Sequence, residues 1–323
     1  MKSMKGQVSD SARKIPPRQI EIDADEAGQR IDNFLFARLK GVPKSRIYRM
    51  LRTGEVRVNR GRVKAPYRLQ AGDMVRLPPV QVAAAGPPAP PGNRPRRLET
   101  RIVYEDEDLL VLDKPAGMAV HGGSGLAGGV IEALRAVRPQ ARFLELVHRL
   151  DRDTSGCLLI AKRRSVLRAL HAQLRSGRVE KRYLALLEGE WRGRFQRVDV
   201  PLRKFVLQGG ERLVKAAEDG KPSQTLFRRL EAFPQATLVE AELLTGRTHQ
   251  IRVHAAWLGH PLAGDERYGD KAANRRWRRL GLKRLFLHAW QVAFRHPRRD
   301  VMIRLEAPLD GELEALLDHL RQP

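Results

Sequence analysis

A proline-rich segment at residues 78–95 divides this chain and rules out a single continuous core. Seven of its 18 residues are proline, and most of the others are alanine or glycine. Proline fixes φ and lacks a backbone N–H, so this composition favours extended polyproline conformations over a packed fold. The sequence therefore predicts two domains, at residues 19–77 and 98–323, joined by a linker at 78–97. Residues 1–18 are polar and basic, and we expect a disordered tail there.

The overall charge of the chain indicates the kind of partner it binds. The 323 residues include 61 Lys and Arg against 37 Asp and Glu, which gives a net charge of +24. Such a balance in a long chain indicates a polyanion, most simply nucleic acid. The rival, an anionic membrane, would require a basic amphipathic helix or a lipidation signal, and neither is found. With no signal peptide and a single cysteine, Cys157, the chain is expected to be cytoplasmic.

The first predicted domain combines helical and strand patterns with a high positive charge. Apolar residues recur at helical spacing in 31–39 and again in 47–51, and a short hairpin pattern follows around 56–63. Between residues 30 and 76 there are 13 basic and 3 acidic residues, a net charge of +10. A small α/β unit with that charge suggests a module that binds phosphates. The alternative is a basic domain whose charged face is only solvated.

Three stretches of this domain, residues 29–35, 43–59 and 71–75, resemble the S4 RNA-binding domain. The resemblance covers nearly the whole segment and implies a salt-sensitive, sequence-tolerant contribution to RNA affinity. Basic residues on and before the second predicted helix are the candidates for that contact. They are Lys44, Arg46, Arg49 and Arg52.

The second predicted domain is rich in strands with helices between them. Apolar stretches or alternating patterns predict strands at 102–104, 109–112, 181–187, 223–230, 237–244, 285–287, 291–294 and 301–305. Helical patterns lie at 130–137, 167–174 and 251–258, and another helix is expected from Gly311. These elements predict an α+β fold built on a mixed sheet. The basic tract 271–284 is expected to be a solvated or RNA-facing loop.

Two aspartates on one polar turn are the first candidates for chemistry. Asp151 and Asp153 flank Arg152, between an apolar segment that ends at Leu150 and another at 157–161. A turn held between two strands can display a carboxylate at the floor of a pocket. We expect only one of the two aspartates to serve such a pocket. The alternative is an ordinary Asx turn, with arginines neutralising its carboxylates.

Three histidines raise the question of a metal site. His249 and His254 are five residues apart, which is about 140° around a helix at about 100° per residue. Zinc-binding pairs on helices use spacings of three or four residues. His260 lies further along the chain. We therefore expect no metal site and assign each histidine a structural or RNA-contacting role.

Three motifs together are similar to the signature of the RluA-type pseudouridine synthases. They lie at residues 148–156, 181–183 and 246–254, in the order of that family, and the resemblance runs from about residue 98 to the C-terminus. It implies a mainly antiparallel sheet with flanking helices and no cofactor or metal. It also implies isomerisation of specific uridines of large-subunit (23S) ribosomal RNA to pseudouridine. Nothing in the sequence requires a dimer, so we expect a monomer. The alternatives are other ribosomal or transfer RNA sites, or a non-catalytic RNA-binding protein of ribosome assembly.

The resemblance also assigns roles to residues. Asp151 is the catalytic aspartate, as nucleophile at the sugar or as an addend to the base ring, and we predict Arg247 as its cation partner. Tyr183 is expected to face the target base and assist proton transfer from C5; otherwise it is a core tyrosine. Arg149 would fill the space that the extruded base vacates, or else contact a phosphate. Ile251 would form an apolar floor. The remaining candidates for RNA contact are His148 and Arg152.

Overall fold

The chain separates into two compact units, residues 1–90 and 91–323. The structure is a computed structural model that describes residues 13–39, 41–82, 97–122, 128–206 and 212–322. The division between the units falls inside the proline-rich segment. Most of the expected linker, residues 83–96, lies outside the described residues, as do residues 1–12 of the expected tail.

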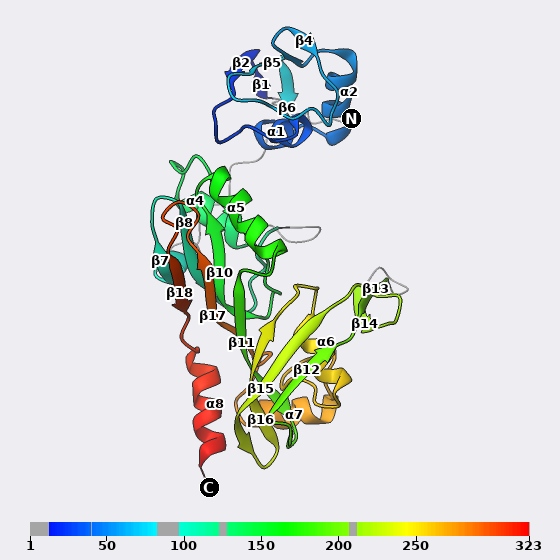
Figure 1. Cartoon of the computed structure of the whole chain (residues 1–323), viewed down its shortest axis with the longest axis vertical. Coiled ribbons are helices and arrows are strands. Elements are labelled where there is room, and N and C mark those ends of the chain that lie inside the picture. The colour runs from blue at the N-terminus through cyan, green and yellow to red at the C-terminus, as the bar shows by residue number, and fades with distance from the viewer. Residues whose placement is uncertain (1–12, 40, 83–96, 123–127, 207–211, 323) are drawn as a thin grey trace, which may run out of the picture. The chain divides into compact units, whose positions relative to one another are not determined.

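The first unit is a small α/β unit with two helices on a short sheet (Figure 1). Its elements are β1 (Arg13–Ile15), β2 (Arg18–Glu21), α1 (Ile31–Arg38), α2 (Lys44–Thr53), β3 (Arg57–Val58), β4 (Gly61–Arg62), β5 (Met74–Leu77) and β6 (Val80–Val82). Strands β2, β5, β3 and β4 pair in that order, all antiparallel. Phe34, Ile47 and Val75 are among the buried side chains that join the helices to the sheet. The predicted helices and hairpin are therefore confirmed.

The sequence boundaries of this unit differ from the predicted range, 19–77. Strand β1 pairs antiparallel with β6, so residues expected in the tail and the linker form a two-stranded sheet. Val80 is only 4% exposed and belongs to the core of the unit. A strand of three residues offers one or two apolar positions, too few for an alternating pattern to reveal it. The prolines at 78 and 79 also indicated an extended linker.

The second unit is built on one large sheet. Its first strands are β7 (Ile102–Glu105), β8 (Leu109–Lys114), β9 (Glu145–Leu146), β10 (Ser155–Ala161), β11 (Glu180–Glu188) and β12 (Phe195–Asp199). The later ones are β15 (Gln224–Phe233), β16 (Ala236–Leu243), β17 (Leu287–Arg295) and β18 (Met302–Glu306). The order is β12-β15-β16-β11-β17-β10-β8-β7, with β18 beside β17 and β9 beside β10. Among these strands only β10 and β17 pair in parallel, so the sheet is mixed and mainly antiparallel, as expected.

Helices and a hairpin lie around this sheet (Figure 1). They are α4 (Val130–Val137), α5 (Arg164–Arg175), α6 (Gln250–Trp257), α7 (Lys271–Arg279), α8 (Gly311–Arg321) and the hairpin of β13 (Leu202–Val206) with β14 (Arg212–Ala216). Side chains of β10 alternate between two cores: Leu158 packs with α4 and α6, whereas Leu159 packs with α5. Burial on both faces explains why this strand reads as one continuous apolar run.

The tract at 271–284 is a helix in its first part, so the predicted loop is wrong there. The Asp270 side chain accepts a hydrogen bond from the N–H of Ala273 at 2.8 Å and caps α7. Trp277 is fully buried and anchors the helix, while its arginines lie on the exposed side. Long basic side chains have good helix propensity, so a high charge density does not by itself indicate a loop.

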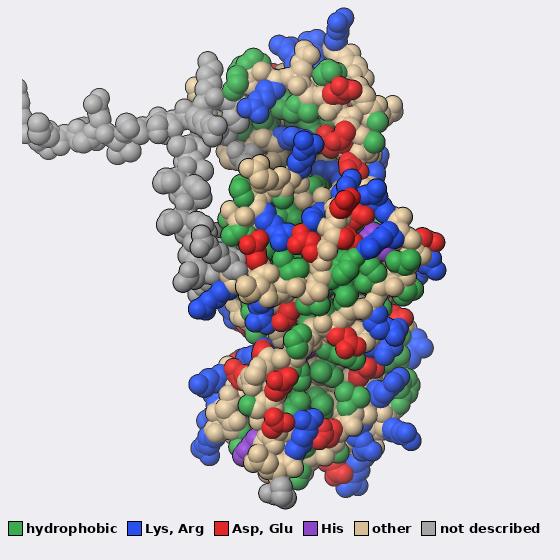
Figure 2. All heavy atoms as spheres, turned by 90° about the vertical axis from the view of Figure 1, so that its left-hand side faces the viewer, with side chains coloured by type: hydrophobic (Ala, Val, Ile, Leu, Met, Phe, Trp, Pro, Cys, Tyr) green, Lys and Arg blue, Asp and Glu red, His purple; other side chains and the backbone are tan. Residues whose placement is uncertain are grey.

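Basic side chains are spread over the surface. On the face shown in Figure 2, Lys and Arg side chains are interspersed with Asp and Glu. None of the described helices is long and apolar enough to cross a membrane.

Candidate active site

A cavity of about 830 Å³ opens in the second unit, where three distant segments of the chain meet. They are the turn before β10, the start of β11 and the segment that leads into α6. The candidates of this unit that line the cavity are His148, Arg149, Asp151, Arg152, Tyr183, Arg247 and Ile251. The convergence of these segments, which no spacing rule could demonstrate, is thus present in the structure.

Backbone contacts hold the turn that carries Asp151 at both of its ends. The N–H of Thr154 donates to the carbonyl of Asp151 at 3.2 Å, which closes the turn. At Gly156 the backbone has φ 104°, and a Cβ would lie 2.2 Å from the carbonyl oxygen of Ala289 on β17. Only glycine allows β10 and β17 to approach this closely. The aspartate turn is therefore tied to the centre of the sheet.

A buried lysine, which was not among the residues predicted from the sequence, holds the other side of the turn. Lys114 at the end of β8 is completely buried, and its Nζ donates to the carbonyls of Pro115, Met118 and Arg152 at 2.9–3.0 Å. Burial lowers the pKa of Lys114 to about 7. The available signal in the sequence was a lysine at the end of an apolar strand, directly before a proline. Such a lysine is expected to be buried, and a buried ammonium group needs acceptors for its three hydrogens.

The two aspartates of the turn have different surroundings. Asp151 lines the cavity with its side chain 27% exposed. Asp153 is outside the cavity lining, and its carboxylate accepts a hydrogen bond from the Arg152 guanidinium at 3.1 Å. Both partners of that pair are exposed to solvent. The expectation that only one of the two aspartates faces a pocket agrees with this geometry.

The structure corrects the predicted partner of Asp151. Among the described residues its ion pairs are with Arg252, whose Nη1 lies 3.7 Å from Oδ2, and with His249, whose Nε2 lies 3.8 Å from the same oxygen. Arg247 lines the cavity too, but its Nε donates to the carbonyl of Pro222 at 3.0 Å. The cation beside Asp151 is therefore Arg252.

Arg252 is held in place by a second carboxylate. Its Nε and Nη2 donate to the two oxygens of Asp265, each at 2.7 Å, and the Asp265 side chain is fully buried. Burial alone would raise the pKa of Asp265, but the hydrogen bonds and charge of Arg252 lower it. This bidentate pair fixes the plane of the guanidinium and leaves Nη1 directed at Asp151.

The backbone explains why Arg252 and not Arg247 reaches Asp151. His249 adopts a left-handed conformation and directly precedes α6, which begins at Gln250. The Gln250 side chain accepts a hydrogen bond from the N–H of Arg247 at 3.0 Å and keeps that residue before the helix. Arg252 then lies in the first turn of α6, on its buried side. An arginine within a buried helical segment implies a carboxylate partner, and that signal was missed.

Tyr183 and Lys181 enter the cavity from β11. Tyr183 is 6% exposed, and burial together with the nearby Asp151 raises the pKa of its phenol. The hydroxyl therefore stays protonated at neutral pH. Burial lowers the pKa of Lys181. The two residues are two positions apart and so lie on the same side of the strand.

The remaining candidates of this unit differ in exposure. Arg149 is exposed at the cavity, whereas Ile251 is 3% exposed and part of the core. His148 accepts a hydrogen bond from the N–H of Leu159 at 3.2 Å, and burial lowers the pKa of His148 to about 4. Neutral His148 therefore fastens the turn to β10, in addition to lining the cavity.

In the first unit, the four basic candidates on α2 are partly exposed or exposed, but they are not equivalent. Arg46 forms two hydrogen bonds to Glu55, at 2.8 and 2.6 Å. The Lys44 ammonium group lies 5.5 Å from the centre of the Phe36 ring. Arg49 and Arg52 are exposed. The charge of Arg46 is therefore largely neutralised within the protein.

The three histidines considered for zinc are not brought together with one another. His254 is fully buried, where its ring nitrogens contact Thr225 Oγ1 at 2.9 Å and the Val200 carbonyl at 3.0 Å. Nδ1 of His260 lies 2.8 Å from the Glu188 carbonyl. His249 faces the cavity instead. Their separate partners argue against a shared metal site.

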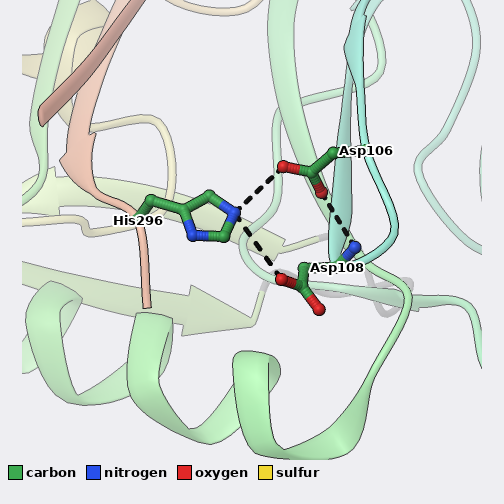
Figure 3. Close-up of side chains that lie close together, drawn as sticks. All are labelled: Asp106, Asp108 and His296. Carbon is green, nitrogen blue, oxygen red and sulfur yellow. Dashed lines mark hydrogen bonds and ion pairs between the residues drawn. The ribbon is translucent and has the colours of Figure 1, made fainter. Parts of the chain in front are cut away.

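Asp106, Asp108 and His296 form a different cluster, away from the cavity (Figure 3). Nε2 of His296 lies 3.0 Å from Asp106 and 3.8 Å from Asp108, between the two carboxylates. Arginines already neutralise both carboxylates, so the group is better described as a set of ion pairs that links the β7–β8 turn to the segment after β17. We call it the clasp; its members are Tyr104, Asp106, Asp108, Arg163, His296, Arg298 and Arg299.

Comparison with known proteins identifies the family. Residues 108–257 match the family model described as RNA pseudouridylate synthase, and residues 29–75 match the S4 domain. The chain is 57% identical over 307 residues to ribosomal large subunit pseudouridine synthase C of Pasteurella multocida, which covers 94% of both chains. It is 56% identical over 306 residues to the protein of that name from Escherichia coli K12, covering 94% of this chain and 96% of that one.

Comparison with solved structures supports the same family. Human RNA pseudouridylate synthase domain containing 4 aligns with 71% of this chain and 95% of its own, at a TM-score of 0.59 and 25% identity. Human RNA pseudouridylate synthase domain containing 1 gives a TM-score of 0.55 at 27% identity, covering 69% of this chain and 94% of its own. The chain belongs to the RNA pseudouridylate synthase family and carries an S4 domain, so it is an isomerase.

Proposed function

We propose that this chain isomerises specific uridines of large-subunit (23S) ribosomal RNA to pseudouridine, with Asp151 as the catalytic carboxylate. The observation that carries the proposal is the position of Asp151 in the cavity, beside Arg252 and near Tyr183. The curated relatives, at 55–57% identity, are named for the large ribosomal subunit and support that substrate. Ribosomal RNA as substrate also fits a cytoplasmic location.

The reaction requires no net oxidation or reduction. The N-glycosidic bond between N1 and C1′ of the uridine breaks, the uracil turns, and a bond forms between C5 and C1′; C5 loses its proton and N1 takes one up. Asp151 can act on the sugar or the base ring because its carboxylate is partly exposed and its two ion-pair partners lie 3.7 and 3.8 Å away, which leaves its oxygens open to a ligand. The Arg252 guanidinium balances its charge. Tyr183, which stays protonated, supplies an aromatic face and a hydroxyl group to the base rather than a phenolate.

The rest of the chain serves the binding of RNA. A uridine must leave its stack to reach Asp151, at a cost of a few kcal/mol, and Arg149 at the exposed side of the cavity is suited to take its place. We propose residues 13–82 as the RNA-binding domain, somewhat longer than 19–77, and residues 98–323 as the catalytic domain. Arg49 and Arg52 are then better candidates for phosphate contact than the neutralised Arg46.

Tritium release from C5-labelled uridine tests the proposal. We expect the full chain to release tritium from a large-subunit rRNA transcript, and not from small-subunit rRNA or transfer RNA transcripts. Asp151→Ala should bind the transcript as the wild type does and release none. Release from transfer RNA alone would overturn the substrate, and binding without release by the wild type would favour a non-catalytic assembly protein.

A further inference from the structure

His249 has a backbone conformation that requires support from its surroundings. Its φ is 55°, in the left-handed region, which residues other than glycine seldom adopt. It precedes α6, but its side chain makes no capping hydrogen bond to that helix. Instead the ring is turned into the cavity with 15% of its side chain exposed. Helix capping therefore does not account for this histidine.

The two ring nitrogens of His249 have different partners. Nδ1 lies 2.8 Å from the hydroxyl oxygen of Tyr268, and Nε2 lies 3.8 Å from Oδ2 of Asp151. The rings of His249 and Tyr268 meet edge to face, with their centres 5.6 Å apart. His249 is thus a bridge between a tyrosine hydroxyl and the proposed catalytic carboxylate.

The partners of the Tyr268 hydroxyl determine where the proton of His249 resides. That oxygen accepts a hydrogen bond from the N–H of Val214 on β14 at 3.1 Å. Its own proton is then available to Nδ1 of His249, so Nδ1 accepts and Nε2 carries the ring proton. The opposite tautomer would turn the lone pair of Nε2 toward a carboxylate, which is electrostatically unfavourable. The Nε2–H group therefore faces Asp151.

The charges around the ring are consistent with a neutral imidazole. Burial lowers the pKa of His249, and although Asp151 opposes this shift, two nearby guanidinium groups favour it. The charged side chains that act on the ring are Asp151, Asp265, Arg252 and Arg267. At neutral pH the Nε2–H group of His249 can then face Asp151, 3.8 Å from its Oδ2, without adding a charge to the cavity.

Tyr268 also contacts Arg252, the other residue paired with Asp151. The Arg252 guanidinium carbon lies 5.0 Å from the centre of the Tyr268 ring, in a cation–π geometry. The Tyr268 hydroxyl therefore contacts His249, and the Tyr268 ring contacts Arg252. His249 and Arg252 are the two residues paired with Asp151. One side chain supports both groups that orient the carboxylate.

We propose that Tyr268 and His249 are positioning residues for Asp151, and that the Tyr268 hydroxyl fixes His249 as the Nε2–H tautomer that holds the carboxylate for attack. This inference rests on the proposed function of Asp151 and extends it to two more residues. His249 is paired with the carboxylate, and Tyr268 acts on it through His249. It assigns the segment that holds Asp265 and Tyr268 a part in orienting the reactive group.

The test separates the hydroxyl of Tyr268 from its ring. Tyr268→Phe keeps the ring over Arg252 and removes only the hydroxyl, so kcat for tritium release should fall about tenfold while KM for the transcript stays within about twofold. Tyr268→Leu removes both and should lower kcat further. Tyr104→Phe is the matched control, because it removes a hydroxyl that is 2.6 Å from Asp106 in the clasp; kcat should not change.

Two further measurements decide between positioning and simple packing. In the His249→Gln background, Tyr268→Phe should cause no additional loss of kcat, because the hydroxyl acts through the imidazole. Nitrogen-15 NMR of histidine-labelled protein should show His249 as the Nε2–H tautomer in the wild type and as a mixture in Tyr268→Phe. If an active wild type shows the Nδ1–H tautomer, or Tyr268→Phe keeps full kcat, the inference is wrong. An inactive wild type would instead overturn the proposed function.

Discussion

Two clusters in the second unit combine carboxylates, a histidine and arginines, yet they are built for different purposes. In the cavity, Asp151 lies 3.8 Å from His249 and 3.7 Å from Arg252, beyond hydrogen-bond distance. In the clasp, Asp106 lies 3.0 Å from His296 and 2.5 Å from Arg299. Residue types alone do not distinguish the two. What differs is whether the carboxylate oxygens remain available to a ligand.

The surrounding backbone produces this difference. The Asp106 carboxylate also accepts hydrogen bonds from the N–H groups of Asp108 and Leu109 and from the hydroxyl of Tyr104, so its acceptors are used. Asp151 is on a turn whose main-chain carbonyls accept hydrogen bonds from the Lys114 Nζ and the Thr154 N–H, and among the described residues none donates such a hydrogen bond to its carboxylate. When hydrogen bonds to backbone groups hold a turn in place, its side chain remains available for chemistry. When hydrogen bonds to the side chain hold the turn, that side chain has a structural role instead.

The largest expected effect comes from neutralising the carboxylate of the cavity. Asp151→Asn should lower kcat by a factor of about 10⁴ or more, because the reactive group itself is removed. The free energy of unfolding should change by less than about 1 kcal/mol, since the side chain is partly exposed and loosely paired. Asp153→Asn, on the same turn, is the matched control and should retain substantial activity. Equal losses in the two variants would contradict the contrast between them.

The second effect concerns the cation beside Asp151. Arg252→Lys keeps the charge but loses the bidentate pair with Asp265, so kcat should fall about 100-fold. Arg247→Ala should act mainly on KM and lower kcat less than about tenfold, because Arg247 is not paired with the carboxylate. Steady-state kinetics on one transcript compares the two variants. If Arg247→Ala proves the more damaging to kcat, the correction from Arg247 to Arg252 is wrong.

The smallest effect on catalysis is expected from the clasp. Asp106→Asn should leave kcat unchanged but lower the free energy of unfolding by about 1–3 kcal/mol, because it removes a hydrogen-bonded partner of the buried His296. Chemical denaturation of both proteins measures the difference. Lost catalysis with unchanged stability would mean that the clasp, and not the cavity, is the functional cluster.

The pH dependence of that difference sharpens the assignment. Burial would raise the pKa of Asp106, but hydrogen bonds from Tyr104 and two main-chain N–H groups lower it to about 2. A carboxyl pKa that is lower in the folded state adds stability above the unfolded value, about 3.8, and loses it as the pH falls through about 2. The stability difference between wild type and Asp106→Asn should therefore be constant above about pH 4 and shrink between pH 4 and 2.

Periodicity and motif spacing predicted much of this protein. The helices α1, α2 and α8 and most strands of the sheet follow from apolar patterns, because each buries one continuous face. The candidate residues at Asp151 and Tyr183 came from motif resemblance, and both line one cavity. Local sequence is sufficient where a residue's role depends on its own turn or strand.

The failures share a physical cause, which is dependence on distant partners. Strands β1 and β6 exist because they pair with each other across 64 residues, not because either has a strong pattern. Helix α7 forms because Trp277 finds a buried site. The partner of Asp151 was misassigned because Arg252 is held in place by Asp265, 13 residues further on, and the motif alone does not show that contact.

Mapping pseudouridines in the large-subunit rRNA of cells that lack this chain tests the central claim most directly. We expect a defined set of pseudouridines to be missing, to return with the wild-type chain, and to remain absent with Asp151→Asn expressed at the same level. Restoration by Asp151→Asn, or an unchanged set of pseudouridines in cells without the chain, would contradict the assignment of Asp151 as the catalytic carboxylate acting on that RNA.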